Sequence, residues 1–320
     1  QVTTVLLRAT RYLKDNRVTP DGLDKESAHD EIAVHGAAAD DADFDDGVDQ
    51  VRYSVPVADD AGPFRVQVEL WYQPIVVLRT GDVTAFEGLA RWRDPHRGLV
   101  MPSEFLELVH ATGLHRRMDR QVLALAARAA ADLGAPRVRV SVNLSARSLG
   151  DRPLRRRLDQ LLETHGLDPS SLCLEINERD IDDDIARVEP ALRELADAGF
   201  ALALDDFGSG YSSLGRLTRL PVDEIKLDRS FAMALEESPR ARTVVSSTLA
   251  MIADLGLTSV AEGIESAETA ALYRELGCQR AQGYYFGRPA PLSTVVPGAH
   301  ELHAPPADPL AIPDRTPLSG

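Results

Sequence analysis

Carboxylate and amide side chains stand at the ends of successive short apolar segments of this chain. Glu175 lies within the run Leu172–Asn177, and Asp205 closes the apolar run Leu202–Leu204. Burying such carboxylates without partners is costly, so their positions indicate one shared site rather than separate surface groups. The complete set is Glu87, Asn143, Glu175, Asp205, Asp206, Lys226 and Glu262.

The charges of this set predict a site for two divalent cations. Five carboxylates only a few Å apart repel one another strongly in a low dielectric. Two divalent ions together with Lys226 would balance them, and oxygen ligands with one amide favour Mg²⁺ or Mn²⁺ over zinc. The adjacent pair Asp205-Asp206 suits two ions about 3.5–4 Å apart, an arrangement that activates water for attack on a phosphoryl centre. A single glutamate at a strand end is usually solvated or paired with arginine, so the prediction depends on the whole set.

The elements that must position these residues alternate between strands and helices. Helix-like runs such as Ser103–Gly134 separate the apolar segments. Eight strands and intervening helices are typical of a TIM-like β/α barrel, whose C-terminal strand ends meet at one mouth. The first two strands are joined only by Leu78–Asp82, too short for a parallel crossover, so the first strand is expected to be antiparallel. The expected strands are Val68–Val76, Val83–Leu89, Val138–Leu144, Leu172–Asn177, Phe200–Asp206, Glu224–Leu227, Thr258–Glu262 and Arg280–Tyr284.

The chain divides into three parts by composition, with the barrel at 68–292. The preceding segment, 1–67, is acidic, and alternation over Val51–Val57 and Phe64–Leu70 predicts a hairpin, hence a small β-rich unit of uncertain role. The last part, 293–320, is rich in proline and is expected to be a disordered tail.

Overall composition excludes several classes of protein. The formal net charge of −15 argues against binding a nucleic acid polymer or an anionic membrane through bulk charge. No apolar run approaches the roughly 20 residues that span a bilayer. The two cysteines, Cys173 and Cys278, are far apart, which is typical of a reducing compartment, and we expect a cytoplasmic protein. A start at Gln1 without a signal-peptide pattern leads us to expect a fragment or processed product.

Eight short motifs follow one another over about residues 72–290. They are Tyr72-Gln73-Pro74-Ile75, Glu87-Gly88-Leu89-Ala90-Arg91-Trp92, Val142-Asn143-Leu144-Ser145, Glu175-Ile176-Asn177-Glu178, Asp205-Asp206-Phe207-Gly208-Ser209-Gly210, Lys226-Leu227-Asp228, Glu262-Gly263-Ile264-Glu265 and Gln282-Gly283-Tyr284. In kind and order these motifs resemble the EAL-domain family of bacterial cyclic di-GMP phosphodiesterases. Gly88 stands where the family signature has alanine, and Asn177 where threonine is usual. The family also carries an amphipathic helix before the first strand, where this sequence predicts a strand.

The resemblance implies roles for individual residues. Lys226 would hold or help to deprotonate the attacking water, acting in catalysis together with Glu87 and Glu262. Glu178 and Glu265 would fix a loop and orient the ligands without touching metal. The resemblance implies substrate contacts for Gln73, Leu89, Arg91 and Gln282, and metal ligation by Glu87, Asn143, Glu175, Asp205, Asp206 and Glu262.

The function implied is hydrolysis of cyclic di-GMP to linear pGpG with two Mg²⁺ or Mn²⁺ ions. The segment Asp206–Leu214 resembles the family's dimer-linked loop, so a homodimer through the barrel is expected. Two alternatives stay open: a catalytically idle EAL domain that senses cyclic di-GMP, and an interaction protein whose N-terminal segment recruits a partner. Metal-dependent turnover separates the enzyme from both alternatives, and binding of cyclic di-GMP separates the idle sensor from the interaction protein.

Overall fold

The computed structural model describes residues 54–56, 65–94, 97–112, 115–134, 138–149, 152–182, 185–209 and 217–295. Eight of its strands close into a barrel, because β2 pairs with both β10 and β3. Among these eight, β2 alone runs antiparallel to its neighbours, which confirms the predicted fold class. The barrel strands are β2 (Arg65–Val77), β3 (Val83–Asp94), β5 (Arg139–Asn143), β6 (Leu172–Asn177), β7 (Ala201–Phe207), β8 (Glu224–Leu227), β9 (Thr258–Ala261) and β10 (Arg280–Gln282).

The reversal between β2 and β3 depends on a tight turn. Gly81 has a φ of 78°, in the left-handed region that glycine adopts without a side-chain clash. Its backbone N–H donates to the Val77 carbonyl at 2.8 Å, and the Val77 N–H donates to the Asp82 carbonyl at 2.9 Å. The short connection therefore forces the antiparallel first strand that its length predicted.

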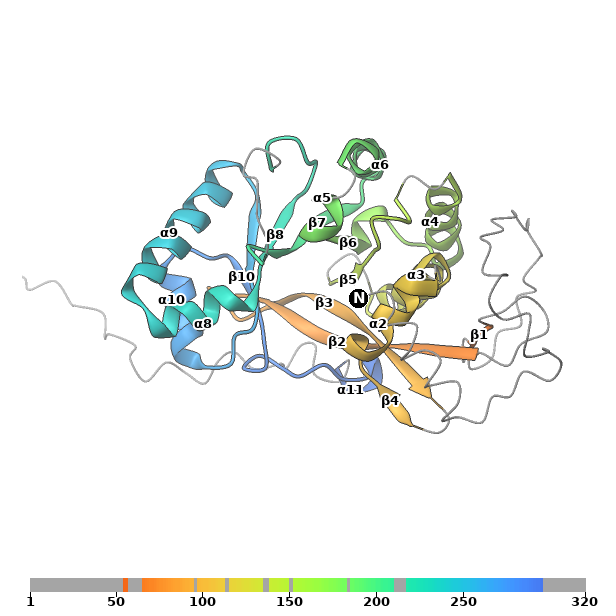
Figure 1. The fold of residues 1–320 in the computed structure, drawn as a ribbon, viewed down its shortest axis with the longest axis horizontal. Coiled ribbons are helices and arrows are strands. Elements are labelled where there is room, and N and C mark those ends of the chain that lie inside the picture. Colours follow the sequence, from red (N-terminus) through yellow and green to blue (C-terminus); the bar gives the residue numbers. More distant parts are fainter. Residues whose placement is uncertain are drawn as a thin grey trace, which may run out of the picture.

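Helices cover the outside of the barrel, and strands β2 and β3 form a long pair along one side (Figure 1). Within the predicted helical run Ser103–Gly134, the structure describes helices over Pro102–Thr112 and His115–Asp132. The helices are α2 (Pro102–Thr112), α3 (His115–Asp132), α4 (Arg152–His165), α5 (Glu178–Asp182), α6 (Ile185–Asp197), α8 (Arg229–Glu237), α9 (Pro239–Asp254), α10 (Ala267–Glu275) and α11 (Leu292–Val295), with a 3₁₀ turn at Pro169–Ser171.

The core lies mainly between the barrel and these helices. Outward-facing strand residues such as Leu174 and Ile225 are fully buried against helix residues such as Leu192 and Ile252. The barrel interior holds small, polar and charged residues, including Ser141, Cys173 and Ala203, besides one apolar cluster of Ile75, Ala85 and Val260. Alternation along each strand therefore directs apolar side chains to the helices and leaves room inside for charge.

Two short strands lie outside the barrel. β1 (Ser54–Pro56) pairs antiparallel with the start of β2, as the predicted hairpin requires, and β4 (Gly98–Val100) pairs antiparallel with β3. The other residues of the N-terminal segment up to 64, and the tail after 295, lie outside the described residues. Within the described part of the chain, no helix has the length and apolar character needed to cross a bilayer.

Candidate active site

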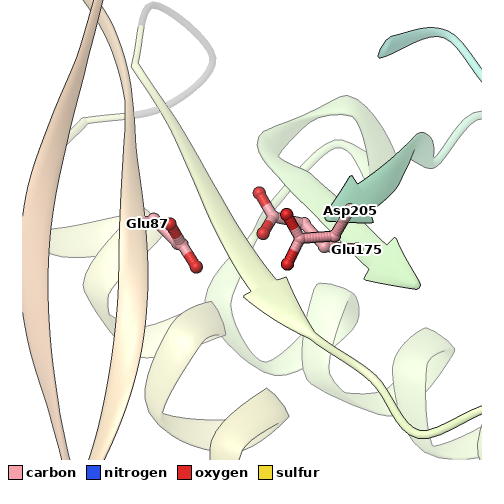
Figure 2. Close-up of side chains that lie close together, drawn as sticks. All are labelled: Glu87, Glu175 and Asp205. Carbon is pink, nitrogen blue, oxygen red and sulfur yellow. The ribbon is translucent and has the colours of Figure 1, made fainter. Parts of the chain in front are cut away.

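The C-terminal ends of the strands deliver the predicted acidic side chains to one mouth. Parallel register places Asn143 opposite Glu175 and Asn177 opposite Asp205. Glu87 from β3, Glu175 from β6 and Asp205 from β7 lie close together there, and each offers a carboxylate oxygen within 4.8 Å of the others (Figure 2). All three side chains are buried.

Lys226 on β8 lies at the centre of this acidic cluster and is only 1% exposed. Its Nζ lies 2.7 Å from Glu175, 2.9 Å from Glu262, and 3.2 Å from both Glu87 and Asp205. Although burial lowers the pKa of an ammonium group, the surrounding carboxylates outweigh it and hold the pKa of Lys226 well above its ordinary value. Lys226 is therefore a permanent cation in this setting.

A second acidic cluster shares one residue with the first. Oxygens of Asp205, Asp206 and Glu262 lie within 4.8 Å of one another. Asp206 has a φ of 56°, the single positive φ recorded for a described residue other than glycine. The Asn177 side-chain amide donates a hydrogen bond to the Asp206 carboxylate. That bond offsets the strain and holds the carboxylate beside Asp205.

The donor set fits two divalent cations. The two clusters share Asp205, whose buried Oδ1 is contacted by the Lys226 ammonium group at 3.2 Å. Burial raises the pKa of Glu175 well above its ordinary value and that of Glu262 to about 8. Neighbouring carboxylates add to this rise, and Lys226 alone does not offset it. Nearby oxygen atoms with excess negative charge are the environment that Mg²⁺ and Mn²⁺ prefer.

Two of the predicted substrate residues, Gln73 and Gln282, and the predicted metal ligand Asn143 join this site through hydrogen bonds and register. Gln282 on β10 donates from Nε2 to Glu87 at 2.6 Å and to the Gln73 side-chain oxygen at 3.0 Å. Gln73 lies opposite Glu87 in the β2–β3 pair and donates to the Gly287 carbonyl at 2.9 Å. Asn143 is exposed at the mouth and donates to Glu87 at 3.2 Å. These amides orient the Glu87 carboxylate.

Arg91 and Leu89 continue the face of β3 that carries Glu87. Arg91 is buried, its Nη1 donates to the Ala90 carbonyl at 2.8 Å, and its Nε has no hydrogen-bond acceptor among the described residues. Burial lowers the pKa of Arg91, while Tyr284, Glu87 and Glu69 act in the opposite direction. A buried guanidinium with an unused donor is suited to an anionic ligand. Leu89 is half-buried beside it.

The two predicted supporting carboxylates differ in their surroundings. Glu178 is buried, and its Oε2 accepts the Gly208 backbone N–H at 3.0 Å, which ties α5 to the segment after β7. Arg179 reinforces that tie by donating to the Ser209 carbonyl at 2.9 Å. Glu265 is exposed, and within the described residues no hydrogen bond or ion pair brings it to the acidic clusters.

Asp119 is a supporting residue that sequence reasoning missed. It is buried on α3 and accepts hydrogen bonds from the Ser148 hydroxyl and from the Ser145 N–H, so it holds the segment that follows Asn143. Burial raises its pKa to about 7. A lone aspartate three residues before Val122 on an otherwise apolar helix face is the signal that could have found it.

The fold and this mouth define the class: a β/α barrel with one reversed strand and an acidic, lysine-centred site. The model of the EAL domain matches residues 64–289. The chain belongs to the EAL domain family, as its motifs predicted.

Named relatives share this domain. Cyclic di-GMP phosphodiesterase NbdA of Pseudomonas aeruginosa is 41% identical over 72% of this chain. The structure described as the c-di-GMP complex of the PaMucR phosphodiesterase is 36% identical, with a TM-score of 0.67, and the match covers 72% of this chain and 94% of that one. Klebsiella pneumoniae BlrP1 has been solved with cyclic di-GMP in two complexes, each with a TM-score of 0.63. The calcium complex is 32% identical and the match covers 70% of this chain and 56% of that one. The manganese complex is 31% identical and the match covers 74% and 58%. This chain spans only 30% of the length of NbdA.

Proposed function

We propose that this chain is a metal-dependent phosphodiesterase that hydrolyses cyclic di-GMP to linear pGpG. The observation that supports it most is the pair of acidic clusters that share Asp205 around Lys226. Relatives of the same family named or crystallised as cyclic di-GMP phosphodiesterases support the choice of substrate.

Each residue of the mouth has a physical task in this reaction. Glu87, Glu175 and Asp205 would hold one Mg²⁺ or Mn²⁺ ion, and Asp205, Asp206 and Glu262 the other. When bound, such ions lower the pKa of water and stabilise negative charge on phosphoryl oxygens. Asn143 would supply an amide oxygen as a further ligand.

The chain's cations and amides would handle the substrate. Lys226, a cation inside the site, would orient the attacking water and stabilise charge that develops on the phosphoryl group. Arg91 would bind a phosphate through its free Nε, and Gln73, Leu89 and Gln282 would contact the dinucleotide. Water would lose a proton as it forms a new P–O bond, and the P–O3′ bond would break as the 3′ oxygen takes up a proton and leaves as a hydroxyl group.

Two carboxylates outside the metal clusters, Glu178 and Glu265, would support the site. Glu178 would fix the segment after β7, and Glu265, in the loop after β9, would help to orient the ligands without touching metal. A homodimer through the barrel and a cytoplasmic location are further parts of the proposal, as is the separation of 1–67 and 293–320 from the catalytic unit.

Product analysis tests the proposal. The whole chain should convert cyclic di-GMP to pGpG in Mg²⁺ and not in EDTA. Glu87→Ala should abolish conversion, while Glu104→Ala, at an exposed side chain, should not. Binding of cyclic di-GMP without conversion would favour the idle sensor, and absence of both would favour the interaction protein.

A further inference from the structure

The face of the β2–β3 pair that begins in the metal site continues outward past it. Gln73 pairs with Glu87, then Trp71 with Leu89, then Glu69 with Arg91. Because side chains two residues apart on a strand share a face, Trp71 and Leu89 stand next to Gln73 and Glu87, about 7 Å farther along the strands. The alternate residues Leu70 and Tyr72 are buried on the opposite face.

Trp71 is held in place by polar contacts rather than by core packing. It is half-buried, and its Nε1 donates to Glu69 Oε1 at 3.0 Å. Arg93 donates two hydrogen bonds of 2.8 Å to the same Glu69 carboxylate. An indole fixed by its nitrogen keeps its apolar ring available and loses little rotamer freedom when a ligand binds.

Trp71 also lies beside the arginine proposed to bind phosphate. The guanidinium carbon of Arg91 is 5.7 Å from the centroid of the Trp71 ring, and Arg91 is buried with a free Nε. A planar apolar ring next to a buried cation is the combination that receives a nucleotide, because the base stacks on one group while the phosphate contacts the other.

We propose that Trp71 is a base-stacking residue of the substrate site, supporting one purine of the dinucleotide while Arg91 contacts the adjoining phosphate. This inference rests on the proposed function, since it names a further contact for the same substrate. It assigns to β2 a further substrate-binding side chain in addition to Gln73. A structural role, in which Trp71 merely covers the rim of the barrel, predicts no effect on ligand affinity.

The two tryptophans of the chain allow a direct optical test. Trp92 faces the opposite side of β3, where it is buried against Phe105 of α2. Cyclic di-GMP, added with Ca²⁺ in place of Mg²⁺, should quench the fluorescence of the wild-type chain and of Trp92→Phe, whereas Trp71→Phe should not respond. Quenching that persists in Trp71→Phe would overturn the inference.

Calorimetry gives a second test that does not depend on Trp92. Trp71→Ala should raise the Kd for cyclic di-GMP by five- to 150-fold, equivalent to about 1–3 kcal/mol, and raise KM with little change in kcat. Mg²⁺ should still raise its melting temperature as it does for the wild type. The matched control Val244→Ala, at a 56% exposed position of α9, should keep the wild-type Kd.

The outcomes separate the two proposals. A wild-type Kd in Trp71→Ala, with wild-type binding and hydrolysis intact, would overturn the stacking role alone. A wild-type chain that neither binds nor hydrolyses cyclic di-GMP would overturn the proposed function and this inference with it.

Discussion

Replacing Lys226 with methionine should destabilise the fold, because the acidic mouth loses its central positive charge. Its Nζ lies 2.7–3.2 Å from four carboxylates, and within the described residues those carboxylates form an ion pair with no other side chain. Removing one partner of a buried ion pair costs about 3–5 kcal/mol, because the other charges stay buried without compensation. For a domain of 150–250 residues this lowers the melting temperature by roughly 6–20 °C.

Mg²⁺ and pH should each change how far the melting temperature of Lys226→Met falls below that of the wild type. Without Lys226 the mouth is more negative, so Mg²⁺ should bind at least as tightly, and the gap in melting temperature should narrow in Mg²⁺ relative to EDTA. The pKa of Glu262 is raised to about 8, so the stability it contributes is present at low pH and is lost as pH rises through 8. In EDTA the wild type should therefore melt higher at pH 6 than at pH 9, and Lys226→Met should show a steeper fall.

Thermal unfolding in EDTA and in Mg²⁺ measures these effects, with activity followed in parallel. Arg280→Met is the control, because Arg280 pairs at 2.6 Å with buried Glu224, which is not a proposed ligand and keeps Arg139 as a partner at 3.1 Å. Its loss of stability should be smaller, and equal with and without Mg²⁺. Turnover should be lost in Lys226→Met and kept in folded Arg280→Met. An unchanged melting temperature for Lys226→Met in EDTA at pH 8 would show that Lys226 does not compensate the buried carboxylates. Complete loss of metal binding would show that it contributes to the metal site itself.

Three further predictions concern the ligands and their supports. Glu87→Ala should abolish turnover and reduce stabilisation by Mg²⁺ while the metal-free melting temperature does not fall, since repulsion among the carboxylates is relieved; wild-type turnover in saturating Mg²⁺ would contradict its role. Glu178→Ala leaves the Gly208 N–H without its acceptor, so turnover should fall more at low than at high Mg²⁺; an equal loss at both would indicate a direct catalytic role. Asp119→Ala removes the acceptor of the Ser148 hydroxyl at a cost of about 1–3 kcal/mol, and chemical denaturation should register that loss, whereas an unchanged unfolding midpoint would show that the contact is dispensable.

The barrel could be predicted from the sequence because its signals are local. The run Glu224–Leu227 is a strand with the predicted bounds, and the short turn around Gly81 dictated the reversed first strand.

The site was predictable at the level of which side chains meet, but not in its supporting contacts. Carboxylates at strand ends must converge in a closed barrel, and the meeting of Glu87, Glu175 and Asp205 follows from that geometry. The bond from Asn177 to Asp206 could not be predicted, because it depends on the positive φ of Asp206 rather than on any spacing. The stacking position of Trp71 likewise needed the register of β2 against β3.

Anomalous scattering from a crystal grown with Mn²⁺ and cyclic di-GMP would show directly whether the mouth of the barrel holds two metal ions. We expect two manganese peaks at the mouth of the barrel, one contacting Glu87, Glu175 and Asp205 and the other contacting Asp205, Asp206 and Glu262. A phosphate of the dinucleotide should lie beside both ions. Well-ordered dinucleotide with no manganese at these carboxylates, or with manganese only elsewhere, would contradict the account.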